Sequence, residues 1–214
     1  MFIGHYAIGL AARRPNHFPS LAVLFIAVQL LDLIWPVLVL SGVETFRIQE
    51  GNTVMTPLDF TSYPYSHSLM MSIVWGILFA ILYFVITRNK KGSFILILLV
   101  ISHWVLDFLT HKPDLQLTPF SETRVGLGLW NHPTVELLLE TALFITGTFF
   151  YFVRMKPKRK VAFWSLIAVF LIIHFVNVFG PTPPSINAVA WSANLMWLFV
   201  LWALWLERSK PQSS

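Results

Sequence analysis

The sequence predicts an all-α, polytopic membrane helix bundle. Of its 214 residues, 56% are hydrophobic and 12% are charged, and the mean hydropathy is +0.68. An ordinary soluble domain does not have this composition. Apolar runs long enough to cross about 30 Å of hydrocarbon recur along the chain, and basic residues gather at their ends. We find no internal repeat, and we expect residues 1–214 to form a single integral membrane domain.

Six apolar segments are long enough to span the bilayer. They lie near residues 19–42, 67–87, 93–111, 133–153, 161–179 and 188–206. Polar or turn-forming stretches separate them. A shorter apolar stretch, residues 1–12, precedes the first span. It lacks the basic residues that open a signal peptide, so we expect a retained short helix that is half-inserted in the membrane or interfacial.

The basic residues indicate the orientation of the chain. If the first pair faces the cytoplasm, twelve of the 15 Lys and Arg residues fall on that side: Arg13, Arg14, Arg88, Lys90, Lys91, Arg154, Lys156, Lys158, Arg159, Lys160, Arg208 and Lys210. Only Arg47, Lys112 and Arg124 fall on the other side. Cytoplasmic loops carry such an excess of Lys and Arg. The pattern therefore predicts that both ends are cytoplasmic, and it argues against a nucleic-acid-binding patch.

Several polar residues fall inside the predicted spans. His103, Asp107 and His111 are spaced four residues apart, so on a helix they form one polar stripe. Ionisable groups inside a membrane usually face the bundle interior or a wet cavity. Counted from the basic clusters, Asp107 and Glu140 lie roughly 18 to 24 Å from the inner face. We therefore expect a polar layer in the outer half of the membrane and one cavity that opens outward.

Some of these polar residues have a simple structural interpretation. His174 is typical of a hydrogen-bonded packing residue, and Glu136 lies in the first turn of a predicted helix, where a carboxylate is favourable. Glu140 lies one turn deeper in an apolar run, and the helix end does not explain it. We therefore consider Glu140 a candidate site residue.

The candidate chemistry is metal binding by nitrogen and oxygen ligands. The chain has no cysteine, so any metal must be held by His, Asp and Glu. His103 and Asp107 present one nitrogen and one oxygen ligand on the same helix face. Further donors are available elsewhere, and the predicted ligands are His5, Asp32, His67, His103 and Asp107. This set suits Zn²⁺, or less specifically Mn²⁺ or Fe²⁺.

Four short motifs in the first 120 residues resemble a known family. They are Gly4-His5, Leu30-Leu31-Asp32, Tyr65-Ser66-His67-Ser68 and Ser102-His103-Trp104-Val105-Leu106-Asp107. In order and spacing they resemble the predicted membrane-bound metal-dependent hydrolases, also described as LexA-binding, inner-membrane-associated putative hydrolases. The resemblance implies a metal-dependent hydrolase of the bacterial inner membrane, with a His-x-x-x-Asp element similar to that of zinc-dependent phospholipases C.

The chain departs from that family at two motifs. Ile34 and Trp35 stand where members often continue an Asp-x-Asp-His pattern, and Ser62 stands where members often have an additional His. Fewer ligands are therefore available, and a single ion is expected rather than two. His111 and Glu140 could supply the missing groups.

The reaction expected from this site is hydrolysis of a lipid or lipid-linked phosphoester by a metal-activated water. His111, at the wet rim, is the predicted proton donor to the leaving group, and Glu140 is a second catalytic candidate. Two alternatives remain open. One is an ion- or proton-coupled small-solute transporter, and the other is a non-enzymatic membrane scaffold. The head group of the substrate and the oligomeric state do not follow from the sequence.

Overall fold

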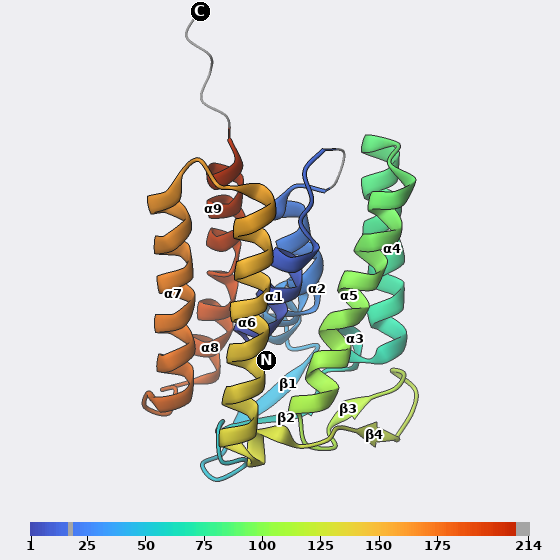
Figure 1. The fold of residues 1–214 in the computed structure, drawn as a ribbon. Coiled ribbons are helices and arrows are strands. Elements are labelled where there is room, and N and C mark those ends of the chain that lie inside the picture. The colour runs from blue at the N-terminus through green and yellow to red at the C-terminus, as the bar shows by residue number, and fades with distance from the viewer. Residues whose placement is uncertain (17–18, 209–214) are drawn as a thin grey trace, which may run out of the picture.

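The computed structural model describes residues 1–16 and 19–208, and it is the predicted helix bundle (Figure 1). The long apolar helices are α2 (Leu21–Leu40), α4 (Leu69–Thr87), α5 (Lys90–Thr110), α6 (Pro133–Met155) and α7 (Lys160–Phe179), and the last span is divided into α8 (Ile186–Asn194) and α9 (Trp197–Glu207). The short helices are α1 (Ile3–Ala12), α3 (Pro64–His67) and the 3₁₀ turn η1 (Leu129–Asn131). Within the described residues, six helical segments are thus long and apolar enough to cross a membrane.

Local sequence sets where four of these helices begin. Ser20, Ser68, Asn89 and Ser185 each accept a hydrogen bond from the backbone N–H three residues later. A side-chain oxygen at this position satisfies a backbone donor that has no partner within the helix, which stabilises it by about 1 kcal/mol. The first residues of α2, α4, α5 and α8 are therefore fixed by short polar residues at the membrane boundaries.

The sixth span is interrupted, whereas the sequence predicted one continuous helix over 188–206. At the interruption the backbone bonds tighten to an i to i−3 pattern, with Leu195 N donating to Ser192 O at 3.0 Å and Met196 N donating to Ala193 O at 3.1 Å. A short 3₁₀ stretch within a helix often marks a hinge. The sulfur of Met196 accepts a hydrogen bond from Gln29 Nε2 of α2 at 3.8 Å.

Helix α1 lies inside the bundle and not at the membrane interface. Most of its residues are buried, and it packs between α2, α5 and α6. A glycine permits the closest approach, because a Cβ atom at Gly147 of α6 would lie 2.3 Å from the carbonyl oxygen of Ala7. Small residues allow helix backbones in membranes to approach in this way. Of the two positions expected for residues 1–12, the buried position of α1 agrees with a helix inserted among the others and not with an interfacial helix.

Two small antiparallel hairpins close one end of the bundle, where the sequence analysis expected only loops. In one, β1 (Thr45–Ile48) pairs with β2 (Leu58–Ser62), and in the other β3 (Leu115–Gln116) pairs with β4 (Arg124–Val125). Phe46 and Phe60 of the first hairpin pack against Trp35 of α2, with ring centroids 5.1 and 5.7 Å away. These contacts hold the hairpin over the end of α2.

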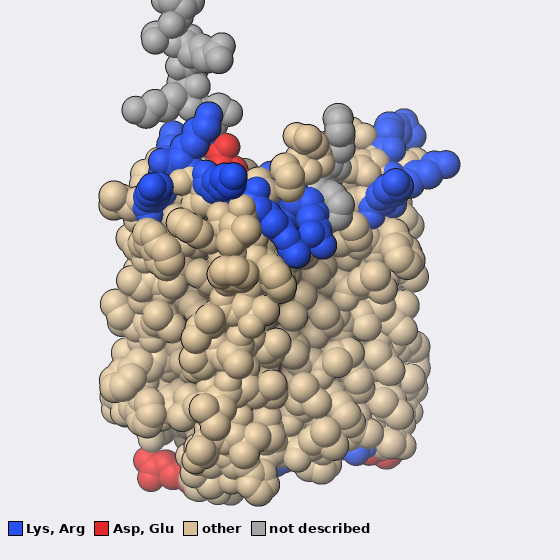
Figure 2. All heavy atoms as spheres, in the orientation of Figure 1, with Lys and Arg blue, Asp and Glu red and all other residues tan. Residues whose placement is uncertain are grey.

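Lys and Arg gather at the opposite end of the molecule (Figure 2). Of the twelve basic residues predicted to be cytoplasmic, all except Lys210 belong to the described part of the chain. Lys210 lies outside the described residues. The positive-inside rule places this end at the cytoplasm and the hairpins on the other side of the membrane.

Candidate metal centre

Side chains from four helices converge on one buried point. His103 Nε2 lies 3.0 Å from Asp107 Oδ2, and His5 Nε2 lies 3.1 Å from Asp107 Oδ1. His67 Nε2 lies 3.3 Å from Asp32 Oδ1 and 3.8 Å from Asp107 Oδ2. Helices α1, α2, α3 and α5 bring together the five predicted metal ligands, which are His5, Asp32, His67, His103 and Asp107. Four of them are buried, and Asp32 is partly exposed.

The backbone fixes the tautomer of His103. Its Nδ1 lies 2.7 Å from the carbonyl oxygen of Val28. Because a carbonyl only accepts hydrogen bonds, Nδ1 carries a proton, and in the neutral imidazole Nε2 then carries the lone pair. That lone pair faces Asp107, and Nε2 has no hydrogen-bond partner among the described residues. A buried lone pair opposite a carboxylate is unfavourable unless a cation lies between them.

A serine and a glutamate fix the tautomer of His67 in the same way. Ser66 Oγ lies 2.6 Å from Glu44 Oε2 and donates to this carboxylate. The same Oγ lies 2.7 Å from His67 Nδ1, so it accepts the Nδ1 proton and the lone pair is on Nε2. Glu44 also accepts from the backbone N–H groups of Tyr65 and Ser66, both at 2.8 Å. Sequence reasoning missed Glu44, which is an isolated acid in a polar loop.

The distances match those expected around one divalent ion. Nitrogen and oxygen ligands bind Zn²⁺ at about 2.0–2.2 Å, so neighbouring ligand atoms lie roughly 3–3.5 Å apart. Two groups of three donors meet the spatial requirement for a shared ion, with all ligand atoms of each group within 4.8 Å of one another. These are His5, His103 and Asp107, and Asp32, His67 and His103. His103 belongs to both groups, so the five residues form one connected set.

The α-amino group of Met1 also reaches this set. It lies 3.1 Å from Asp107 Oδ1 and is fully buried. Its positive charge offsets part of the negative charge of the carboxylates, but it contacts the carboxylate oxygen that faces His5 and not the one that faces His103. The nitrogen lone pairs of His67 and His103 therefore still lack a cation.

His111, a predicted catalytic residue, lies outside this set and has partners of its own. Its Nδ1 lies 2.9 Å from Asp114 Oδ1, and its ring centroid lies 4.2 Å from that of Trp130. Tyr63 donates to the same Asp114 oxygen at 2.5 Å. Burial raises the pKa of Tyr63 well above its ordinary value, and Asp114 raises it further, so the phenol stays protonated and donates. The sequence analysis did not identify Tyr63 or Asp114.

Glu140, the other predicted catalytic residue, also lies outside the five-residue set. Its Oε1 accepts a hydrogen bond from Gly4 N at 2.9 Å, and its Oε2 lies 3.6 Å from His174 Nδ1. His174, which the sequence analysis describes as typical of a hydrogen-bonded packing residue, faces this carboxylate.

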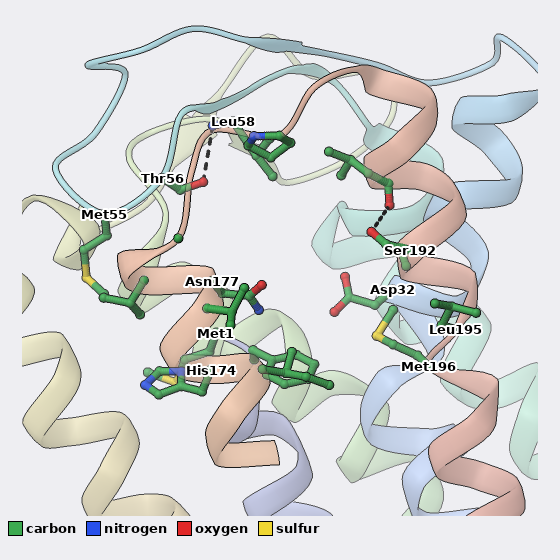
Figure 3. Close-up of a pocket in the computed structure, with 18 of the residues that line it drawn as sticks. Met1, Asp32, Met55, Thr56, Leu58, His174, Asn177, Ser192, Leu195 and Met196 are labelled. Atoms are coloured by element: carbon green, nitrogen blue, oxygen red, sulfur yellow. Dashed lines mark hydrogen bonds between the residues drawn. The ribbon is translucent and has the colours of Figure 1, made fainter. Parts of the chain in front are cut away.

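A cavity of about 1240 Å³ connects these groups. Its lining includes Asp32, His67, Asp107, His111 and Glu140. Met55, Thr56 and Leu58 lie at one end of it, and Ser192, Leu195 and Met196 lie along one side (Figure 3). The cavity thus reaches the loops opposite the basic end, as expected. It also extends along α7 and α9 as far as Trp202 and Trp205, which the sequence did not predict.

The Glu44–Ser66 pair gives a testable prediction. Removing the hydroxyl group by Ser66→Ala frees the ring of His67, and loss of groups that orient a ligand typically lowers metal affinity by about 10–100-fold. Titration of the metal-free protein with Zn²⁺ or Mn²⁺ measures the change. Ser72→Ala is the matched control, because Ser72 is equally buried but donates only to the backbone oxygen of Ser68. Equal affinities of the two variants would contradict the assigned role of Ser66.

Comparison with known proteins gives a family but no activity. Neither the curated proteins nor the solved structures include a match to this chain. A family model described as YdjM inner membrane protein matches residues 58–208, which is more than half of the chain. Together with the six apolar helical segments, this match shows that the chain belongs to the YdjM family and is a multi-pass inner membrane protein.

Proposed function

We propose that the protein is a metal-dependent hydrolase that cleaves a lipid or lipid-linked phosphoester. One observation carries the proposal. The Nδ1–H groups of His67 and His103 donate hydrogen bonds to Ser66 Oγ and to the carbonyl oxygen of Val28. The Nε2 atoms of both rings therefore face the carboxylates of Asp32 and Asp107, which line a cavity. A neutral imidazole oriented by its other nitrogen is the usual state of a metal-binding histidine.

The donor set fits a divalent ion. Three imidazoles and two carboxylates without sulfur suit Zn²⁺, Mn²⁺ or Fe²⁺. When bound, such an ion supplies a water of lowered pKa and neutralises charge on the phosphoryl oxygens. His5, Asp32, His67, His103 and Asp107 would hold the ion. Figure 1 shows α3, which carries His67, near the hairpins, and Figure 2 shows the basic residues at the other end of the molecule.

His111 supplies the proton in this proposal. Asp114 and Tyr63 hold its Nδ1 side, and the ring borders the same cavity as Asp107. With a phosphodiester, water adds to phosphorus and the P–O bond to the leaving alcohol breaks. His111 protonates the alcohol oxygen, and the proton lost by the attacking water restores the protonated His111. The products are then the free alcohol and a phosphate monoester; with a lipid-linked diphosphate the leaving group that receives the proton is a phosphate. Asp114 acts as a positioning residue, because it fixes the ring and keeps Nε2 free.

The shape of the cavity supports a lipid substrate. Val176, Leu198 and Leu201 line it, belong to helices long and apolar enough to span the membrane, and are 54–58% exposed. These exposed apolar side chains support an opening of the cavity toward lipid. From Leu195 to Trp205 it follows ten residues of the last span, or about 15 Å. This length can hold part of an apolar chain while the phosphoester lies at the metal.

A substrate screen tests the proposal. The purified protein, loaded with Zn²⁺ or Mn²⁺, is incubated with phospholipids, lipid phosphates and lipid-linked diphosphates, and products are detected by mass spectrometry. We expect turnover of at least one lipid phosphoester, its loss with a chelator and its return with added metal. Soluble esters with the same head group should react far more slowly. The hydrolase proposal fails if the metal-loaded protein turns over none of them, and uptake into sealed vesicles without product would support transport instead.

A further inference from the structure

Asn177 is a polar residue inside an apolar span, and its side chain points into the cavity. It belongs to the last turn of α7, and the reaction proposed above does not use it. Figure 3 shows its amide directed into the cavity, with Asp32 and Ser192 on the opposite side. His174 lies one turn earlier on the same face of α7. Asn177 therefore borders the same space as the candidate metal centre.

The amide of Asn177 has no protein partner. Within residues 1–16 and 19–208 its nitrogen and its oxygen make no hydrogen bond, although the residue is exposed and lines the cavity. The hydroxyl group of Ser192, in contrast, already donates to the carbonyl oxygen of Val189 at 2.8 Å. A polar group inside a membrane bundle usually faces a substrate or a wet cavity. The amide of Asn177 can donate two hydrogen bonds to an occupant of the cavity.

The surroundings of this amide favour an uncharged acceptor. Among the described residues, no Lys or Arg lines the cavity. Charged phosphoryl oxygens are bound most strongly by charged donors, and at the candidate metal centre the α-amino group of Met1 and the proposed ion carry the positive charge. The lining beside Asn177 is apolar and includes Val176, Leu198 and Leu201. A neutral donor at this position therefore suits a neutral oxygen that adjoins an apolar chain.

The level of Asn177 in the membrane indicates which oxygen this is. From Lys160, the first residue of α7, the helix rises about 25 Å to Asn177. The hydrocarbon core is about 30 Å thick, so this level is close to its outer boundary. In a glycerophospholipid the ester groups lie at this boundary, between the phosphate and the acyl chains.

We propose that Asn177 determines lipid specificity by donating a hydrogen bond to an ester carbonyl of a bound glycerophospholipid. The phosphoester lies at the candidate metal centre, the ester carbonyl at Asn177 and the acyl chain along α7 and α9. Isoprenoid phosphates have no such carbonyl and bind without this contact. The inference rests on the part of the proposed function that places a lipid phosphoester in the cavity, and not on its cleavage.

Binding of two matched lipid probes tests the inference. Both are phosphonate analogues of phosphatidylglycerol, in which a P–C bond replaces the P–O bond to the glycerol that carries the chains and prevents hydrolysis there. One has ester-linked chains and the other has ether-linked chains of equal length. In detergent with Zn²⁺, the wild type should bind the ester-linked probe about 3- to 10-fold more tightly, as expected of one neutral hydrogen bond. Asn177→Leu should bind both probes equally.

Asn194→Leu is the matched control. Asn194 also lies in a membrane span, but its amide donates to the carbonyl oxygen of Ala190 in its own helix at 3.0 Å. This variant should keep the preference of the wild type. Because a general loss of structure weakens the binding of both probes alike, the ratio of the two affinities reports the hydrogen bond itself.

The inference is overturned if the wild type binds both probes equally, or if Asn177→Leu keeps the preference for the ester. A polyprenyl phosphate serves as a third probe, and its affinity should be the same in the wild type and in Asn177→Leu. An equal loss of affinity for all three probes in Asn177→Leu would overturn the assignment to the ester carbonyl. Selective binding of the ester-linked probe without turnover in the substrate screen would overturn the proposed hydrolysis and support the role of Asn177.

Discussion

Replacing Asp107 with asparagine is expected to remove the ion of the candidate metal centre and with it any hydrolysis. Both carboxylate oxygens are engaged: Oδ1 lies 3.1 Å from His5 and Oδ2 lies 3.0 Å from His103. In Asp107→Asn the side chain keeps its size but loses its charge. The new amide can also donate to the lone pair of His103, which removes the need for a cation. The loss of metal affinity should therefore exceed the about 10–100-fold expected for Ser66→Ala.

Metal content and lipid turnover of the purified variant measure this effect. Asp59→Asn is a suitable control, because Asp59 pairs with Lys112 at 2.7 Å in the hairpin region and does not contact the predicted ligands. We expect the control to retain both metal and activity. If Asp107→Asn binds as much metal as the wild type, Asp107 is not a ligand and the centre must be assigned differently.

The second large effect is expected at Gly147, where α6 touches α1. A Cβ atom at this position would meet the oxygen and the carbonyl carbon of Ala7 at 2.3 and 2.8 Å. These are backbone atoms, so Gly147→Ala must push α1 away from α6. Overpacking of this kind costs about 1–3 kcal/mol. Because α1 carries His5, the shift should also weaken metal binding at the candidate metal centre.

Unfolding in detergent and titration with Mn²⁺ test this prediction. Gly76→Ala in α4 is the matched control, since its Cβ would meet the nearest atoms at 3.4 Å, an ordinary contact distance. The control variant should be close to the wild type in stability and affinity. Should both alanine variants behave alike, the close approach of α1 and α6 would not be important for the centre.

The helical spans could be predicted because a bilayer demands them. A chain crossing hydrocarbon must satisfy its backbone hydrogen bonds internally, so long apolar runs become helices whatever their exact sequence. The hairpins β1–β2 and β3–β4 have no such constraint. Their strands are two to five residues long and are held by contacts such as that of Phe46 with Trp35, which sequence periodicity does not reveal.

The candidate centre was predictable only where its geometry is local. His103 and Asp107 lie one helical turn apart, so their shared face follows from the sequence. The grouping of His5, Asp32 and His67 with them rested on polarity inside apolar segments and on a family resemblance. Glu44 and Asp114 could not be found in this way, because their roles depend on how two loops fold over the helix ends. The contact between Glu140 and His174 was not predicted, because it joins two helices, α6 and α7, at positions far apart in the sequence.

The buried position of α1 has a consequence for biogenesis. Residues made first in the nascent chain acquire partners made much later, since His5 pairs with a residue 102 positions away and Gly4 with one 136 positions away. His5 therefore gains its counterpart when α5 enters the bilayer, and Gly4 gains its counterpart only with α6. The candidate metal centre and its contact to α6 should therefore be completed late, after insertion of the fourth long helix.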